Sequence, residues 1–282
     1  MINWNISTIR LLNSSILVGV SGGLRLYLAF LLAGITPILP LVVASALIIY
    51  ATYTLDRSLE SKEDDINHQE LADANKMTGL VVSGIAITIG IVLFFSKFLF
   101  IPPLFPFIVG ILYSRGITLK KKEFKLKGGL GMKNLVIGIT WGGTIGLIIA
   151  STGHALAALV ICLFFGMKLF INSTIFDLKD VKGDLAAGIQ TLPVVLGEQK
   201  LKWILFSLCV IQHIILALAI AWGILIPITF FLLYSFFSEG LVIISYSPAF
   251  ESANSWLQRK FRSIMIDGES MIQVIFSIFL PC

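Results

Sequence analysis

Three acidic residues that follow the second long apolar segment of the chain are spaced to share one face of a helix. Asp56, Glu60 and Asp64 recur every four residues, and at about 100° per residue each step drifts by only about 40°. Asn67 lies three residues further along, on the same side. Stacked carboxylates repel one another, and a bridging cation removes that repulsion. Oxygen ligands favour Mg²⁺, which completes its shell with water and phosphate oxygens; an ordinary solvated acidic loop is the alternative.

A second group of acids follows the sixth apolar segment and has a similar arrangement. Asp177, Asp180 and Asp184 occur at i, i+3 and i+7, which again places them on one helix face. A charged helix end at the membrane surface is the alternative interpretation. The presence of two such groups favours a shared task, because two facing sets of carboxylates can hold metal ions between them. A diphosphate would bridge those ions, which would neutralise its charge as a C–O bond breaks.

The composition indicates which elements carry these acids. Of the 282 residues, 57% are hydrophobic and only 13% are charged, whereas a soluble domain has about 25% charged residues. The mean hydropathy is +0.94, and a membrane-spanning helix needs about 20 apolar residues. The apolar runs are continuous rather than alternating, so we predict an all-α polytopic membrane bundle of about nine transmembrane helices, the last of them short. The segments are 13–36, 38–55, 77–96, 98–114, 132–151, 154–175, 201–221, 223–246 and 268–282.

The basic residues predict the orientation of these segments. Of 21 Lys and Arg, Arg25 and Lys168 lie inside apolar segments and Lys97 lies in the turn after the third. The others fall in the N-terminal segment and in the loops after the even-numbered segments, whereas the loops after the first, fifth and seventh carry none. Because basic loops stay in the cytoplasm, we expect one transmembrane domain, residues 1–282, in the cell membrane with a cytoplasmic N-terminus. Its cytoplasmic loops would be 56–76, 115–133, 177–200 and 247–267.

A few polar side chains are predicted inside the bilayer, where an ionisable group is a candidate functional residue. Lys168 and Asn172 precede Asp177 within the sixth segment, and we expect both to contact substrate, although a lysine can also extend to the interface. Arg25 and Glu239 are similar intramembrane charges to which the sequence assigns no partner. The histidines share no metal-ligand spacing and receive no predicted role.

The residues after the sixth segment resemble a motif of the UbiA superfamily of intramembrane prenyltransferases. That family carries DxxDxxxDxxxGxxTLP at this place, and all seven defined positions are present here as Asp177, Asp180, Asp184, Gly188, Thr191, Leu192 and Pro193. The first motif is a variant of the family's NDxxDxxxD. Asp56 stands where the family has Asn, and Arg57 stands where it has the first Asp. The acidic ligand expected at position 57 is therefore lost.

The loop after the fourth segment also resembles that family. Tyr113-Ser114 ends the fourth segment, a basic loop follows, and Lys133-Asn134 begins the next segment. The resemblance implies a helical bundle around a central cavity, with Mg²⁺ at the two acidic motifs and the tail of a prenyl diphosphate in the cavity. It implies that the six acids of the two motifs are catalytic metal ligands. Residues expected to bind substrate are Arg57, Asn67, Tyr113, Arg115, Lys120, Lys122, Lys168 and Asn172.

The predicted activity is Mg²⁺-dependent transfer of a prenyl group from a prenyl diphosphate to a lipophilic acceptor within the membrane. The acceptor is open: an aromatic ring, a lipid alcohol, a haem or chlorin, or another isoprenoid. Membrane lipids are expected partners and nucleic acid is not. Two alternatives stand beside this prediction. One is a catalytically divergent homologue, suggested by Arg57. The other is a cation- or lipid-binding membrane protein, although transporters usually carry their acids near the bilayer midplane.

Overall fold

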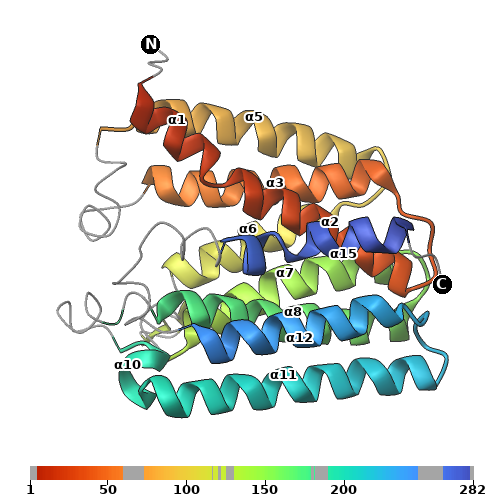
Figure 1. The fold of residues 1–282 in the computed structure, drawn as a ribbon. Helices are drawn as coiled ribbons and strands as arrows, with labels where there is room; N and C mark the ends of the chain where they lie inside the picture. Colours follow the sequence, from red (N-terminus) through yellow and green to blue (C-terminus); the bar gives the residue numbers. More distant parts are fainter. Residues whose placement is uncertain are drawn as a thin grey trace.

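The chain folds into a bundle of long helices that lie side by side (Figure 1). The computed structural model describes residues 5–59, 73–115, 117–119, 122–124, 130–178, 181, 190–246 and 263–279. The first half contains α1 (Ile6–Asn13), α2 (Ile16–Leu32), α3 (Leu39–Leu59), α5 (Lys76–Phe95), α6 (Ile101–Arg115) and α7 (Met132–Ala150). The second half contains α8 (Ala155–Asp177), α10 (Leu192–Leu196), α11 (Glu198–Ala221), α12 (Thr229–Ser245), the π-helical turn η2 (Ser263–Asp267) and α15 (Glu269–Phe279).

The all-α prediction is confirmed, because each of the nine predicted segments contains a helix. Six helical stretches in the described part of the chain are long and apolar enough to cross a membrane, and α12 and α15 are apolar but shorter. The described loop between α6 and α7 adds a feature that the sequence did not predict. Strand β1 (Ile117–Leu119) pairs antiparallel with β2 (Lys122–Phe124), within the expected basic loop.

The helix ends carry the signals that stop one segment and start the next. The side chain of Asn5 accepts a hydrogen bond from the Thr8 amide at 2.7 Å, and Asn75 accepts one from the Thr78 amide at 3.2 Å. Each of these caps satisfies an amide that lacks a partner in the first turn of a helix. The breaks that follow α2, α5, α7 and α11 are short, so consecutive helices are antiparallel neighbours.

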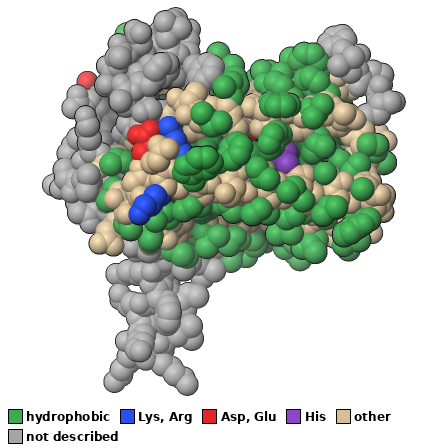
Figure 2. Space-filling model, turned by 60° about the horizontal axis from the view of Figure 1, so that its bottom comes forward, with side chains coloured by type: hydrophobic (Ala, Val, Ile, Leu, Met, Phe, Trp, Pro, Cys, Tyr) green, Lys and Arg blue, Asp and Glu red, His purple; other side chains and the backbone are tan. Residues whose placement is uncertain are grey.

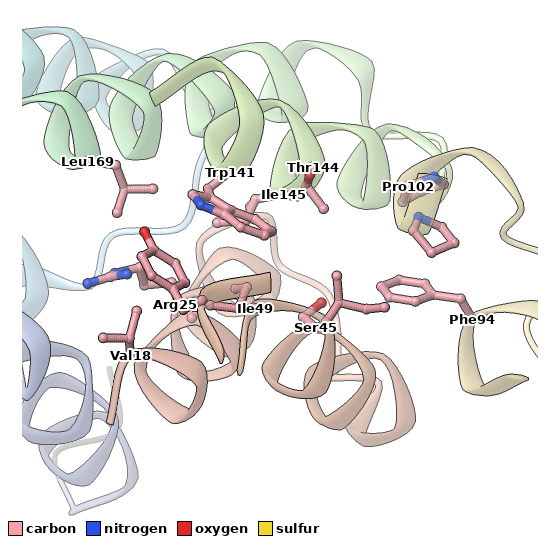
Figure 3. Close-up of a pocket in the computed structure, with 14 residues that line it drawn as sticks. Val18, Arg25, Ser45, Ile49, Phe94, Pro102, Trp141, Thr144, Ile145 and Leu169 are labelled. Atoms are coloured by element: carbon pink, nitrogen blue, oxygen red, sulfur yellow. The ribbon is translucent and has the colours of Figure 1, made fainter. Parts of the chain in front are cut away.

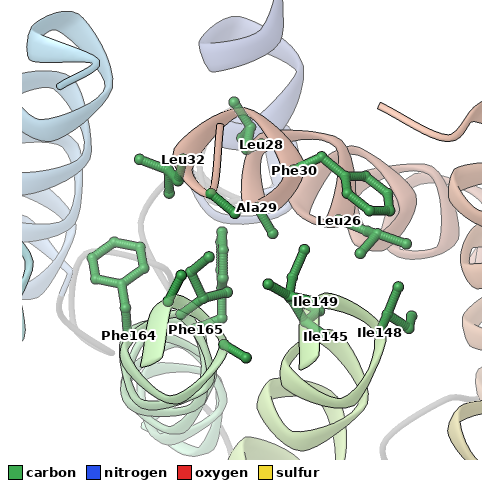
Figure 4. Close-up of a cluster of buried hydrophobic side chains, with 14 of the residues drawn as sticks. Leu26, Leu28, Ala29, Phe30, Leu32, Ile145, Ile148, Ile149, Phe164 and Phe165 are labelled. Carbon is green, nitrogen blue, oxygen red and sulfur yellow. The ribbon is translucent and has the colours of Figure 1, made fainter. Parts of the chain in front are cut away.

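The larger hydrophobic cluster of the bundle includes much of α2. Leu26, Leu28 and Phe30 of α2 are fully buried, and Figure 4 shows this helix over Ile148 of α7 and Phe164 of α8. The outer surface is apolar as well. Figure 2 shows hydrophobic side chains over most of the visible described surface, with charged side chains gathered toward one end. An apolar outside as well as an apolar inside is the pattern expected of a helix bundle in lipid.

Helices α7 and α8 approach each other closely because small residues face each other across their contact. A Cβ atom added to Gly142 would lie 2.6 Å from the Cα of Gly166 and 2.7 Å from the carbonyl oxygen of Cys162. A Cβ atom on Gly138 would lie 2.5 Å from the Gly166 carbonyl oxygen. Such close packing of small residues stabilises helix pairs in membranes. It fixes the end of α8, where Asp177 lies, against the beginning of α7.

One end of the bundle collects the loops that carry the predicted chemistry. In Figure 1 the described ends of α3, α6 and α8 and the beginnings of α7 and α11 lie at the left, on the side of the N-terminus. The short breaks after α2, α5, α7 and α11 lie at the right, with the C-terminus. This alternation agrees with the segment count predicted from the basic residues, and it places Asp56 and Asp177, the first acids of the two motifs, at the same end.

Candidate active site at one end of the bundle

Asp177, the last residue of α8, is held in place by two residues of the first turn of α7. Its side chain is only 6% exposed. Asn134 donates from Nδ2 to Asp177 Oδ2 at 2.8 Å, and Lys133 donates from Nζ to Oδ1 at 3.2 Å. The two partners differ in burial, because Asn134 is 1% exposed whereas the Lys133 side chain is 60% exposed. Asn134 therefore sets the orientation of the carboxylate, and Lys133 adds a positive charge that remains open to solvent.

Asn134 contributes a second polar atom to this site. Its side-chain oxygen Oδ1 is buried and has no hydrogen-bond partner among the described residues. A buried polar atom without a partner costs about 1–3 kcal/mol, so native structures rarely retain one without a reason. The amide oxygen beside Asp177 is a free acceptor for a water molecule, a hydroxyl group or a metal ion.

The end of α3 explains the Arg57 variant of the first motif. Arg57 is half-buried, and its guanidinium donates to Ser14 Oγ and, at 2.9 Å, to Ser15 Oγ. These two serines form the break between α1 and α2. Arg57 therefore ties the N-terminal helices to the end of α3, whereas the neighbouring Asp56 is exposed at the surface. The sequence alone gave no sign of this contact, because the partners lie 43 and 42 residues away.

Three more of the residues predicted to form the site lie in described helices or strands. The backbone of Tyr113 and Arg115 lies in the last turn of α6, at the same end as Asp56 and Asp177, and that of Lys122 begins β2. The remaining predicted residues lie outside the described part of the chain: Glu60, Asp64, Asn67, Lys120, Asp180 and Asp184.

Lys168 and Asn172 lie deeper in the bundle than Asp177. Nine residues separate Lys168 from Asp177, which is about 13 Å along a helix. Lys168 is 2% exposed, and its ammonium contacts Ser235 Oγ at 3.0 Å, Glu239 Oε2 at 3.3 Å and Glu269 Oε2 at 3.0 Å. Its three N–H donors therefore all face partners within the protein. Asn172 is 7% exposed, and its Nδ2 has no hydrogen-bond partner among the described residues.

A small cavity lies inside the bundle, lined by helices that carry the predicted motifs. It has a volume of about 30 Å³, which is room for very few water-sized molecules. Figure 3 shows Arg25 and Trp141 on one part of its wall and Phe94 and Pro102 on another. Tyr53 also lines it, and its ring stacks on Trp141 with centroids 6.4 Å apart. A substrate chain can enter only if these side chains move apart.

Helical spacing from the acids would have found the two aromatic residues that sequence reasoning missed. Tyr53 precedes Asp56 by three residues, which is about one turn. Trp141 follows Asn134 by seven residues, which is about two turns on the same face. The cavity wall therefore begins directly below the residues that carry or hold the acids.

A larger hollow of about 810 Å³ lies along α7 and α8, between Phe105 of α6 and Leu208 of α11. None of its lining residues is charged, and many are glycine, alanine or leucine. It cannot bind a diphosphate, so the candidate active site remains at the end that carries Asp177.

Comparisons with known proteins bear on the family and the fold of this chain. The sequence matches the UbiA prenyltransferase family over residues 21–263. Two curated relatives, digeranylgeranylglyceryl phosphate synthases from two strains of Halobacterium salinarum, are 37% identical over 75 residues. That match spans 27% of this chain and about a quarter of the length of each relative. A solved structure described as digeranylgeranylglyceryl phosphate synthase in membranes superposes with a TM-score of 0.55, at 16% identity, over 96% of this chain and 93% of its own. The family match covers most of the sequence, and the chain belongs to the UbiA prenyltransferase family.

Proposed function

We propose that this protein transfers a prenyl group from a prenyl diphosphate to a lipophilic acceptor inside the membrane. The observation that carries the proposal is the oriented carboxylate of Asp177, held by Asn134 and Lys133, at the end of a bundle that contains a cavity lined mainly by apolar side chains. A diphosphate needs charged partners, and a prenyl tail needs an apolar cavity. Charged side chains and the cavity wall lie within a few turns of each other along α7.

The polar residues at this end fit a magnesium ion. The donors are oxygens: the carboxylates of Asp177 and Asp56, and Asn134 Oδ1, which lacks a partner among the described residues. Asp180, Asp184, Glu60 and Asp64 would complete the set by the motif spacing. Mg²⁺ prefers such ligands and keeps several waters and phosphate oxygens. When bound, it neutralises the charge of the leaving diphosphate. Lys133, exposed beside Asp177, adds a point charge for the phosphate oxygens.

The cavity below the acids supports the second part of the reaction. When the C–O bond to diphosphate breaks, an allylic cation remains that water would consume, so the site must exclude water. Apolar and aromatic side chains line the cavity, and the faces of Tyr53 and Trp141 can stabilise a cation through their π electrons. The acceptor then forms the new bond to this carbon and gives up its proton.

The names of the curated relatives suggest the substrates. They point to a geranylgeranyl donor and to a lipid alcohol that carries a glyceryl phosphate, so we propose this class ahead of aromatic or haem acceptors. The contact of Arg57 with Ser14 and Ser15 also bears on the alternative that this protein is a catalytically divergent homologue. Arg57 has a structural task there and leaves Asp56 exposed, which supports an active enzyme rather than a degenerate one.

The test is a reaction with the full chain in detergent or nanodiscs. Geranylgeranyl diphosphate and Mg²⁺ are supplied with either a geranylgeranylglyceryl phosphate or an aromatic acceptor, and both diphosphate release and lipid products are measured by mass spectrometry. We expect a product with the glyceryl phosphate lipid and a loss of at least about 100-fold in Asp177→Asn, the usual size of a lost catalytic electrostatic group.

The matched control is Glu198→Gln, which removes an acid from the same end of the bundle. The Glu198 side chain is 39% exposed and pairs with Lys202 one turn away on α11, so its loss should leave the rate unchanged. Two outcomes would contradict the proposal in different ways. If the wild type released no diphosphate with either acceptor, the proposed transfer activity would be wrong. If Asp177→Asn were as active as the wild type, the assigned site would be wrong.

A further inference from the structure

A dense polar cluster lies inside the bundle, away from the end that carries Asp177. Its centre is Lys168 of α8, which contacts Glu239 of α12 and Glu269 of α15. Gln212 of α11 donates to Glu239, and Gln273 donates to Glu269 at 2.9 Å. All five residues are 3% exposed or less. Four helices therefore meet around charged groups in a region where the surrounding side chains are apolar.

The charges that the structure describes in this cluster do not balance. Around Lys168 there is one ammonium group for two carboxylates. Arg25 of α2 also faces Glu269 and Asp267. The ammonium of Lys168 itself is outnumbered by the two carboxylates that it contacts. An unbalanced buried charge is costly in a protein interior, and more so at membrane depth.

The atoms without partners gather on the Glu239 side of the cluster. Glu239 Oε1, His213 Nε2 and Gln212 Oε1 are buried and have no hydrogen-bond partner among the described residues. Cys209 is fully buried, and its thiol faces the carboxylate of Glu239. One ligand atom from each of Cys209, His213 and Glu239 lies within 4.8 Å of the others.

We propose that Cys209, His213 and Glu239 form a site for one divalent cation of the zinc class, inside the membrane and separate from the magnesium site. A sulfur, a nitrogen and a carboxylate oxygen are the ligand types that zinc combines, whereas Mg²⁺ takes oxygens only. In a tetrahedral site, zinc bond lengths place ligand atoms about 3.3–3.6 Å apart. His213 Nδ1 lies 2.7 Å from the Cys209 carbonyl oxygen, so Nε2, which has no hydrogen-bond partner among the described residues, is the nitrogen left for the ion. Side-chain movement within this group of three residues would complete the geometry.

Charge balance favours the same ion. A divalent cation with a thiolate adds one net positive charge, which offsets the excess of carboxylates in contact with Lys168. The neighbouring contacts also resemble the outer layer of a metal site, where ligands are oriented by further hydrogen bonds. Lys168 and Gln212 hold Glu239, and His213 Nδ1 lies 2.7 Å from the Cys209 carbonyl oxygen. Gln212 Oε1 is available as a fourth ligand.

The proposed ion would join α11 to α12 and, through Glu239 and Lys168, to α8. Its expected role is therefore to stabilise the bundle. The spacing of Cys209 and His213, four residues apart, was the available sequence signal. It passed unnoticed because the third ligand comes from another helix.

The experiment measures metal in the full chain, purified in detergent through a tag that contains no histidine. After washing with a chelator to remove loosely bound metal and incubation with zinc alone, we expect about one zinc ion per chain by inductively coupled plasma mass spectrometry. Cys209→Ser should lose most of that zinc. The matched control is Cys162→Ser, since Cys162 is the other free cysteine of the described residues, and it should retain the wild-type amount.

Cobalt alone provides a second measurement, and its result for the wild type does not depend on how well any variant folds. Wild-type protein loaded with Co²⁺ should show the charge-transfer absorption of a thiolate–cobalt bond, and Cys162→Ser should show it too. The proposal is overturned if the wild type holds neither zinc nor the cobalt absorption, because a proton then balances the cluster. It is equally overturned if Cys209→Ser binds as much zinc as the wild type.

Discussion

Replacing Lys168 by methionine distinguishes a role in binding the diphosphate from a role in stabilising the bundle. If Lys168 binds the diphosphate, the variant keeps its stability and its KM for the donor rises. The structure predicts the opposite, because the ammonium is 2% exposed and lies between two buried carboxylates at 3.0 and 3.3 Å. Removing one member of a buried ion pair costs about 3–5 kcal/mol, since the remaining charge is left without a partner.

The magnitude translates into a measurable shift in thermal unfolding. One kcal/mol lowers Tm by roughly 2–4 °C in chains of 150–250 residues, so Lys168→Met should lower it by roughly 6–20 °C. The control is Lys202→Met. Lys202 also pairs with a glutamate, at 2.9 Å, but its side chain is 18% exposed and its partner Glu198 is 39% exposed. Such a surface pair contributes about 1 kcal/mol or less, so its Tm should change by no more than a few degrees.

The assay is differential scanning fluorimetry in detergent, followed by donor KM at a temperature where both variants are folded. We expect the KM of Lys168→Met to stay within about twofold of the wild type, because uniform substrate binding is not lost. A normal Tm together with a strongly raised KM would refute the reasoning and return Lys168 to the substrate-binding residues.

Two further predictions concern the site and the packing that supports it. Asn134→Ala removes a buried hydrogen bond to the Asp177 carboxylate, a type of bond with a contribution of about 1.5–3 kcal/mol. We therefore expect kcat/KM to fall by roughly 10- to 150-fold, and an unchanged value would show that the orientation of Asp177 is unimportant. Gly142→Ala should lower stability by about 1–3 kcal/mol through overpacking, because its Cβ would meet the backbone of α8. The control Gly84→Ala has no atom within 4 Å of the added carbon and should be neutral or slightly stabilising; equal unfolding temperatures would contradict the packing argument.

The sequence predicted the helices and their alternation well because both follow from single-residue properties. Continuous apolar runs define spans, and basic residues collect in alternate loops. The position of Asp177 was predicted for the same reason, since its motif is local. The charged interior was harder. Lys168 and its partner Glu239 are 71 residues apart, so no local pattern connects them, and the sequence left Glu239 without an assigned partner.

The first motif shows a second limit. The sequence predicts that Arg57 replaces a metal-binding acid and contacts the substrate instead. Its contact with Ser14 and Ser15 depends on how α1 turns into α2, which residue types alone do not define. The burial of Asn134 was equally hidden, because it results from the close approach of α7 and α8 rather than from its own neighbours.

The contact between Lys168 and Glu269 also imposes an order on biogenesis. Helix α8 leaves the ribosome long before α12 and α15, so Lys168 enters the bilayer while neither carboxylate partner has yet been synthesised. A lone lysine at the centre of a membrane helix costs about 2.5–3.5 kcal/mol during insertion, which the strongly apolar remainder of α8 must offset. Lys168 stays unpaired until α12 supplies Glu239, and its second carboxylate partner arrives only with α15, the last described helix.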